Sequence, residues 1–102
     1  MLSRVAEALL WIGRYVERAE DTARLLDVHF HEVLEDPSVD EAGACAVLLS
    51  VMGIPDGTAR RHRDSRAVLE LLGYDAETPN SIVGALVAAR QNARGAREAL
   101  SA

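Results

Sequence analysis

Arginine and carboxylate side chains are the groups in this chain that are best suited to chemistry. All 11 basic residues of the 102-residue sequence are arginine. Without lysine, the chain has no side-chain amine for Schiff-base chemistry or for a phosphate-binding loop of the Gly-Lys type. Arginine stays charged at physiological pH, and its planar fork binds carboxylates and phosphates through paired hydrogen bonds. The composition therefore excludes catalysis by a side-chain amine and leaves arginine as the basic side chain of this sequence.

One cluster of such groups lies between residues 14 and 27. Charged residues recur there at intervals of three and four: Arg14, Glu17, Arg18, Glu20, Asp21, Arg24 and Asp27. Pairs four residues apart, such as Glu20 with Arg24, stabilise an exposed helix by about 0.2–0.5 kcal/mol each. A solvated, salt-bridged face is one interpretation of this cluster, and a polar surface that binds a ligand or partner is the other.

A second cluster is formed by three arginines that share one side of a helix: Arg90, Arg94 and Arg97. Because like charges at this spacing repel one another, we expect anionic groups to neutralise them. These groups are either carboxylates of the first cluster (Glu17, Glu20 and Asp27), which would form an interhelical salt ladder, or a carboxylate or phosphate of a ligand. The spacing alone favours the ladder.

Histidine and cysteine spacing predicts no metal site. His29 and His31 are two residues apart and point to different faces of a helix, and no Glu-x-x-His pair of the ferritin-like kind occurs. Cys45 lies in an apolar segment, so we predict a buried structural thiol. Asp27 and Glu35 lie one turn to either side of His31 and could tune it as a general base, but a surface histidine is the preferred interpretation.

The first cluster must be positioned by a long helix, predicted over residues 3–35. Apolar or small residues alternate along it at intervals of four and three: Val5, Leu9, Ile12, Val16, Ala19, Ala23, Leu26, Phe30 and Val33. Such a heptad seam indicates packing against another long helix. Ser3 is suited to cap the start, and Pro37 ends the helix because proline disfavours helical geometry at Asp36.

Two short helices are predicted after the long one. Ser38 and Glu41 match a capping box ahead of an apolar helix over residues 42–52, which Gly53 ends. Residues 55–57 have the composition of a turn, and the polar residues 58–63 are interpreted as a loop.

The next apolar block, residues 68–72, predicts a third helix with Asp64 or Ser65 as its cap and Gly73 as its end.

Asn80 or Ser81 then begins a fourth helix with its own seam: Ile82, Leu86, Ala89, Ala93, Ala96 and Leu100. The small residues of the two long seams allow the first and last helices to pack as close neighbours. No segment alternates every two residues as a half-buried strand does. The predicted fold is all-α, a helical bundle with two long heptad-patterned helices and two shorter ones, in one domain over residues 1–102.

Composition also restricts the partners. The net charge of −5 argues against nucleic acid, and the basic run at residues 60–63 has no interleaved aromatic residue. The apolar run at residues 8–12 is too short for a signal core or a membrane span. A single cysteine cannot form an internal disulfide, which favours a reducing compartment. We therefore expect a cytoplasmic protein that binds neither nucleic acid nor membrane.

Residues 1–28, MLSRVAEALLWIGRYVERAEDTARLLDV, resemble the opening of the bacterial alpha-E domain family, an all-helical family named for its Glu-Arg motif. That motif is Glu17-Arg18 here, and residues 80–101 are similar to a second part of the family's pattern. Gln91 departs from the pattern, in which glutamate is more usual. The matching positions are Glu17, Arg18, Arg90, Asn92, Arg94 and Arg97.

The resemblance implies an accessory role. The family is similar in genomic setting to partners of ATP-grasp-type peptide ligases and transglutaminase-like peptidases. We therefore expect a helical module of a bacterial peptide ligation or modification system, without a cofactor and not catalytic by itself. Its polar cluster would recognise a carboxylate, a phosphate or an acidic peptide through Glu17, Arg18, Glu20, Arg90, Asn92, Arg94 and Arg97.

Two alternatives remain open at this point. One is an enzyme, amide-bond-forming or peptide-modifying, whose site a partner completes and in which Glu17 is the general acid or base. The other is a purely structural oligomerisation bundle.

Chain length leads to one more expectation. Members of the family typically have several hundred residues, so the resemblance implies a fragment of a larger domain or a shortened member. In either case the apolar seam that reaches Leu100 lacks cover within the chain. We therefore predict self-association into a homo-oligomer.

Overall fold

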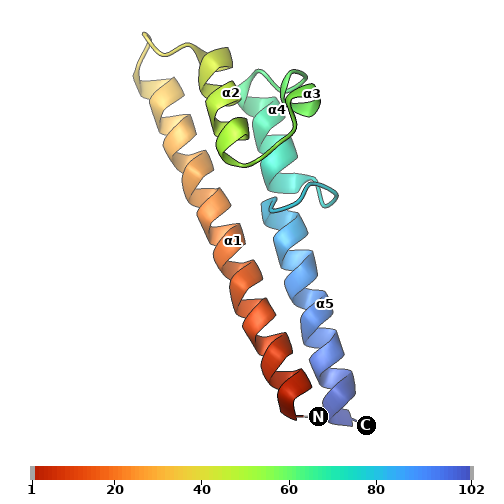
Figure 1. The fold of residues 1–102 in the computed structure, drawn as a ribbon. Helices are drawn as coiled ribbons and strands as arrows, with labels where there is room; N and C mark the ends of the chain where they lie inside the picture. Colours follow the sequence, from red (N-terminus) through yellow and green to blue (C-terminus); the bar gives the residue numbers. More distant parts are fainter. Residues whose placement is uncertain (1, 102) are drawn as a thin grey trace.

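Two long helices form the body of the molecule and make its most extensive contact. The computed structural model describes residues 2–101, in which α1 spans Leu2–Glu35 and α5 spans Ile82–Ser101. The two helices lie side by side, as their small residues predict, and they run antiparallel, an orientation that the sequence left open (Figure 1). The molecule measures 58 × 26 × 17 Å, so much of its length is only two helices thick.

The shorter elements gather at one end of this helix pair. They are α2 (Glu41–Val51), α3 (Asp56–Ala59), α4 (Ser65–Leu69) and a π-helical turn, η1 (Glu70–Tyr74), that continues directly from α4. Figure 1 shows them beside the last turns of α1 and ahead of α5. Residues 2–101 contain no strand, and the all-α bundle predicted from the sequence is confirmed.

Helix ends follow the expected chemistry but not always the expected residue. The capping box at Ser38 is wrong: Asp40 caps α2, and its carboxylate accepts a hydrogen bond from the Gly43 amide at 3.2 Å. Ser38 instead donates its hydroxyl to the Asp36 carboxylate at 2.6 Å. Aspartate one residue before the helix is the better cap because its side chain reaches the third amide of the helix. Gly53 ends α2 as predicted, with a φ of 74° that glycine adopts without strain.

The segment predicted as a turn and loop contains a short helix. Residues 55–63 include α3, which begins after Pro55. Proline fits this position because its fixed φ is compatible with the first turn and its missing amide is not needed there. Downstream, Asp64 caps α4 through the Ala67 amide at 2.8 Å, one of the two caps predicted. The helical run then continues beyond the predicted end at Gly73 to Tyr74.

The seam predicted along α1 is only half correct. The buried and half-buried residues at heptad spacing are Val5, Ala8, Ile12, Tyr15, Ala19, Thr22, Leu26, His29 and Val33. Every second predicted position is therefore right, and Phe30 is also half-buried, against the hydrophobic core. Leu9, Val16 and Ala23 lie one residue too late and are exposed.

The same shift occurs in α5. Its inward positions are Ile82, Ala85, Ala89, Asn92, Ala96 and Ala99, whereas Leu86, Ala93 and Leu100 are exposed. Ala85 and Ala99 face inward in place of Leu86 and Leu100 because small side chains let two helix backbones approach closely. Polar Thr22 and His29 are tolerated inside because each makes a hydrogen bond there.

The hydrophobic core lies at the end of the molecule where the short helices gather. Its buried members come from α1, α2, the segment after α2, α4 and η1: Leu26, Cys45, Leu48, Leu49, Ile54, Val68, Leu71 and Leu72. Toward the other end, the buried contact residues between α1 and α5 are alanines: Ala19, Ala85, Ala89 and Ala96. Large buried side chains are thus concentrated at one end of the molecule, and close packing of the α1 and α5 backbones stabilises the other end.

Candidate functional site

Arg18 of α1 lies beside a small hollow between α1, the start of α5 and the loop at residues 76–80. Its guanidinium carbon is 5.4 Å from the centre of the Tyr15 ring, which is cation–π distance. Tyr15 and Arg18 line the hollow together with the loop, Gly84, Ala85 and Ala88, around a volume of about 210 Å³. The stacked ring restricts the guanidinium and leaves its forked edge available for an anion.

The loop that forms one wall of this hollow is held by hydrogen bonds around Asp75. The Asp75 carboxylate accepts bonds from the Thr78 hydroxyl at 2.8 Å and the Glu77 amide at 3.0 Å. These bonds hold the pKa of Asp75 below its ordinary value, the Thr78 hydroxyl contributing most. Ser81 then donates its hydroxyl to the Asp75 carbonyl at 2.6 Å and accepts the Gly84 amide at 2.9 Å. Ser81 is therefore the residue that caps α5, one of the two predicted.

Asn80 connects this loop to α1. Its φ of 64° lies in the left-handed region, which asparagine enters more readily than most residues. In this conformation its carbonyl accepts a 2.7 Å hydrogen bond from the hydroxyl of buried Thr22. This contact fixes the position of the loop along the axis of α1, one helical turn from Arg18.

The carboxylates of the first cluster do not join Arg18. Glu20 forms an ion pair of 2.8 Å with Arg24 one turn away, as the spacing predicts, with both side chains exposed. Glu17 is exposed. Because an exposed pair of this kind contributes at most about 1 kcal/mol, the Glu20–Arg24 pair is a surface feature of α1.

The arginine stripe of α5 forms no ion pair with these carboxylates in residues 2–101. Arg90, Arg94 and Arg97 are all exposed, and no ion pair joins α1 to α5 within residues 2–101. The interhelical salt ladder that the spacing favours is therefore not formed there. Arg94 and Arg97 line an open hollow of about 640 Å³ along the outer side of α5.

Asn92 is separate from the arginines. It is half-buried against α1, and its side-chain amide donates to the Ala88 carbonyl one turn earlier at 3.0 Å. The seven residues predicted as one polar cluster are thus not brought together. Arg18 borders the hollow beside the loop, Asn92 lies in the contact between α1 and α5, and the other five are exposed to solvent.

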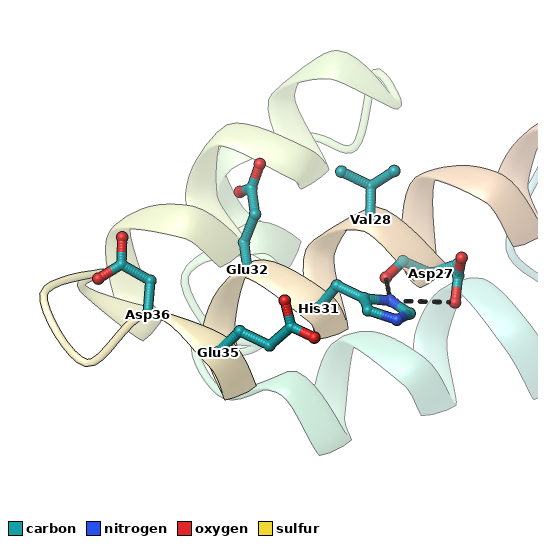
Figure 2. A pocket seen from close by; sticks show the side chains of 6 residues that line it. All are labelled: Asp27, Val28, His31, Glu32, Glu35 and Asp36. Carbon is teal, nitrogen blue, oxygen red and sulfur yellow. Dashed lines mark hydrogen bonds and ion pairs between the residues drawn. The ribbon is translucent and has the colours of Figure 1, made fainter.

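A second hollow, of about 480 Å³, lies at the end of α1 and is lined mainly by acidic residues (Figure 2). His31 sits among them, and its Nδ1 lies 2.9 Å from the Asp27 carbonyl and 3.3 Å from the Asp27 carboxylate. The carbonyl contact and then the Asp27 charge raise the pKa of His31, with a smaller contribution from Glu35. His31 is exposed, in agreement with its interpretation as a surface histidine.

A buried polar contact was missed by sequence reasoning. His29 Nε2 lies 2.9 Å from the Ser65 hydroxyl and 3.7 Å from Cys45 Sγ, so α1, α2 and α4 meet at one imidazole. The Ser65 amide donates to the Glu41 carboxylate at 2.9 Å. Burial raises the pKa of the Cys45 thiol, which matches the structural role predicted for it. The heptad position of His29 is the signal that could have indicated this contact.

Residues 2–101 contain neither a metal-binding group of side chains nor a membrane-spanning helix. No group of three or more histidine, cysteine, aspartate or glutamate side chains is arranged to hold a metal ion. No helix in the same residues combines the length and the hydropathy needed to cross a membrane.

Comparison with known families identifies the chain's relatives. Residues 1–102 match the model of the Alpha-E family, described as a predicted alpha-helical domain with a conserved ER motif. The chain belongs to the Alpha-E family. Glu17-Arg18 is the only Glu-Arg pair in its sequence, so Arg18, in the hollow beside the loop, is the arginine of that motif.

Individual relatives of this Alpha-E chain are uncharacterised proteins of mycobacteria. One from Mycobacterium bovis and one from Mycobacterium tuberculosis are 34% identical over 113 residues, covering 96% of this chain and 13% of the relative. A second protein of Mycobacterium tuberculosis is 33% identical over the same span. The chain therefore corresponds to about an eighth of the length of these relatives. No solved structure matches it.

Proposed function

We propose that this Alpha-E chain is a helical binding module whose Arg18 recognises a carboxylate of a peptide. The observation that carries the proposal is the position of Arg18: the arginine of the family's motif is stacked on Tyr15 and borders a hollow. Because stacking already restricts the guanidinium, little further conformational entropy is lost when a ligand binds. The planar fork of the guanidinium favours a planar anion.

The size and lining of the hollow indicate which anion it suits. Its volume of about 210 Å³ is below the roughly 300–1,000 Å³ of pockets that enclose whole small molecules. It accommodates one side chain or one chain end of a peptide. Glu77 lines the same hollow and repels a dianion, so a single carboxylate is favoured over a phosphate.

The arginine stripe of α5 would provide a second, weaker anionic contact. Arg94 and Arg97 are exposed on the outer side of α5, where an extended acidic peptide or a phosphate can reach them. Solvent screening limits each such contact to about 1 kcal/mol. The stripe therefore adds affinity for acidic chains but little selectivity.

The biological setting remains part of the proposal. We propose that the module works beside an ATP-grasp-type ligase or a transglutaminase-like enzyme, the partners that the resemblance suggests, and that it presents or holds a peptide as an accessory in the cytoplasm. Its unpaired and buried Cys45 is compatible with a reducing compartment. If the module acts in this way, it has no turnover alone and lowers the KM of its ligase for the peptide.

Titration with acetyl-Ala-Glu-Ala-amide, a peptide that carries a single carboxylate, tests the role of Arg18. We expect Arg18→Ala to weaken binding about tenfold or more, the size of effect that follows from losing a charge-assisted hydrogen bond. Arg18→Lys retains the charge but loses the fork, so it should recover only part of the affinity. The measurement is an NMR shift titration that follows the Tyr15 ring and the loop amides.

Arg14→Ala is the matched control. Arg14 stacks on Trp11 at 5.6 Å one turn earlier on α1, in nearly the geometry of Arg18 on Tyr15, but it does not line the hollow. Binding should survive this change. Equal losses for the two variants, or no titration with the wild type, would leave Arg18 a packing residue of the helix surface.

A further inference from the structure

Two opposite charges border the hollow beside Arg18 without neutralising each other. Arg18 from α1 and Glu77 from the loop at residues 76–80 both line it, and both side chains are exposed. No ion pair joins them within residues 2–101, and Glu77 forms no other ion pair there. A ligand in the hollow can therefore meet a cation that belongs to α1 and an anion that belongs to the loop.

Glu77 is held beside the hollow by the hydrogen bonds that build the loop. Its amide donates to the Asp75 carboxylate at 3.0 Å. Thr78, the next residue, is buried and donates its hydroxyl to the same carboxylate at 2.8 Å. The backbone on both sides of the Glu77 side chain is thus tied to one group. Because the loop is already ordered, little backbone entropy is lost when a ligand reaches this carboxylate.

A backbone oxygen of the loop adds an acceptor next to Glu77. The Ala76 carbonyl oxygen lies 3.2 Å from the position that a methyl group on Gly84 would take, and both residues line the hollow. This oxygen accepts no hydrogen bond from another group of residues 2–101. A carboxylate and a carbonyl at neighbouring positions suit a donor with several N–H groups, such as an ammonium.

This pattern of charges suits a ligand that carries an ammonium close to its carboxylate. Among the residues of a peptide, an N-terminal aspartate or glutamate has this arrangement, with the ammonium on its α-carbon and the carboxylate on Cβ or Cγ. An internal acidic residue carries the carboxylate alone. The hollow has about 210 Å³, less than the roughly 300–1,000 Å³ of sites that enclose whole small molecules. One terminal residue can enter it while the rest of the peptide stays outside.

We propose that the hollow recognises the N-terminal aspartate or glutamate of a peptide. The side-chain carboxylate of that residue lies at Arg18, and its α-ammonium lies at Glu77 and the Ala76 carbonyl. This inference rests on the proposed function, in which Arg18 binds a carboxylate, and it adds which residue of the peptide is bound. A chain with a net charge of −5 repels acidic ligands in general. The ammonium contact offsets this repulsion, because the bound residue then has no net charge.

Titration with a pair of peptides tests the ammonium contact. The peptides are Asp-Ala-Ala-amide with a free N-terminus and its acetylated form, followed by NMR as above. We expect the wild type to bind the free form about three- to fivefold more tightly, the size of a solvent-screened charge contact. Glu77→Gln should weaken binding of the free form without weakening that of the acetylated form, so the preference disappears.

Glu17→Gln is the matched control for this variant. Glu17 is next to Arg18 in the sequence and is exposed, but it does not line the hollow. The substitution makes the same change in net charge, so any preference that arises only from the overall charge of the protein should respond equally to both variants. We expect the preference for the free N-terminus to survive in Glu17→Gln. Asn-Ala-Ala-amide, which keeps the ammonium but lacks the carboxylate, should bind most weakly and should not respond to Arg18→Ala.

Four results would overturn the inference. They are equal binding of the free and acetylated peptides, equal effects of Glu77→Gln and Glu17→Gln, tighter binding of both peptides to Glu77→Gln, and tighter binding of free alanine than of Asp-Ala-Ala-amide. The third would show that Glu77 only screens Arg18, and the last would assign the hollow to free amino acids. If Arg18→Ala still weakens binding of the acetylated peptide, the proposed function survives. If Arg18→Ala affects neither peptide, the proposed function fails as well.

Discussion

Two arginine–aromatic pairs one turn apart on α1 show how the surroundings decide what a side chain can do. Arg14 over Trp11 and Arg18 over Tyr15 differ by only 0.2 Å in the distance from guanidinium carbon to ring centre, 5.6 against 5.4 Å. Only the second pair has a loop beside it, built by Asp75. The chemistry available to Arg18 thus depends on a carboxylate far away in the sequence.

His31 provides a pH-dependent prediction at the scale of single residues. Its pKa is raised above the ordinary 6.5 by the Asp27 carbonyl and then by the Asp27 charge. A raised folded-state pKa means that charged His31 stabilises the protein fully below about pH 6.5 and that this contribution is lost as the pH rises through the folded-state value. NMR titration should therefore give a His31 pKa above 6.5.

Asp27→Asn is the informative variant for this titration. It removes the carboxylate charge but keeps the carbonyl, so the pKa of His31 should fall toward its ordinary value without reaching it. Because the side chain is exposed, the effect on stability should be small. An unchanged pKa in the variant would show that the Asp27 charge is screened out.

At the scale of elements, the joint between the loop and α5 depends on one glycine. A methyl group added at Gly84 would lie 2.8 Å from the Ser81 hydroxyl and 3.0 Å from the Thr78 carbonyl. The loop would have to move, because part of what the methyl group meets is backbone. The N-terminal turn of α5 and the wall of the hollow therefore require a residue without a side chain at Gly84.

Gly84→Ala should lower the Tm, since overpacking costs about 1–3 kcal/mol and exceeds the roughly 1 kcal/mol gained from alanine in a helix. Gly95→Ala is the control on the same helix, where nothing lies within 4 Å of the added methyl group. That change should raise stability by about 0.5–1 kcal/mol. Thermal unfolding followed by circular dichroism compares the two, and stabilisation by both changes would contradict the close approach at Gly84.

Elements were more predictable from the sequence than the way they meet. The long helices, Gly53, Asp64 and Ser81 follow from local rules on spacing and capping, and the structure confirms them. Part of the inward face was wrong because hydrophobicity favours Leu9, Leu86 and Leu100, whereas close helix packing favours the alanine that precedes each of them. The hollow beside Arg18 could not be predicted, because it depends on a left-handed Asn80 and a long-range bond to Thr22.

At the scale of the whole molecule, packing is uneven along the 58 Å length. Large buried side chains gather where α2, α4 and η1 meet α1, and the buried apolar residues between the long helices elsewhere in residues 2–101 are alanines. Local opening free energy follows the density of buried apolar contacts. The two ends of α1 should therefore differ in stability although they belong to one helix.

Hydrogen exchange of the dilute protein should reveal this difference. We expect amides of residues 6–14 and 90–100 to exchange faster than those of residues 22–33, 45–51 and 68–72. Uniform protection along α1 at low concentration would contradict the uneven packing.

α1 begins and α5 ends at the same extremity of the molecule (Figure 1). A load applied through the two ends would therefore not shear the long helices past one another. It would separate them like a zipper, one layer at a time, starting at the thinly packed extremity and reaching the leucine-rich core last. Resistance to pulling would rise along the molecule as the alanine layers give way to the contact of Thr22 with Asn80 and then to the core.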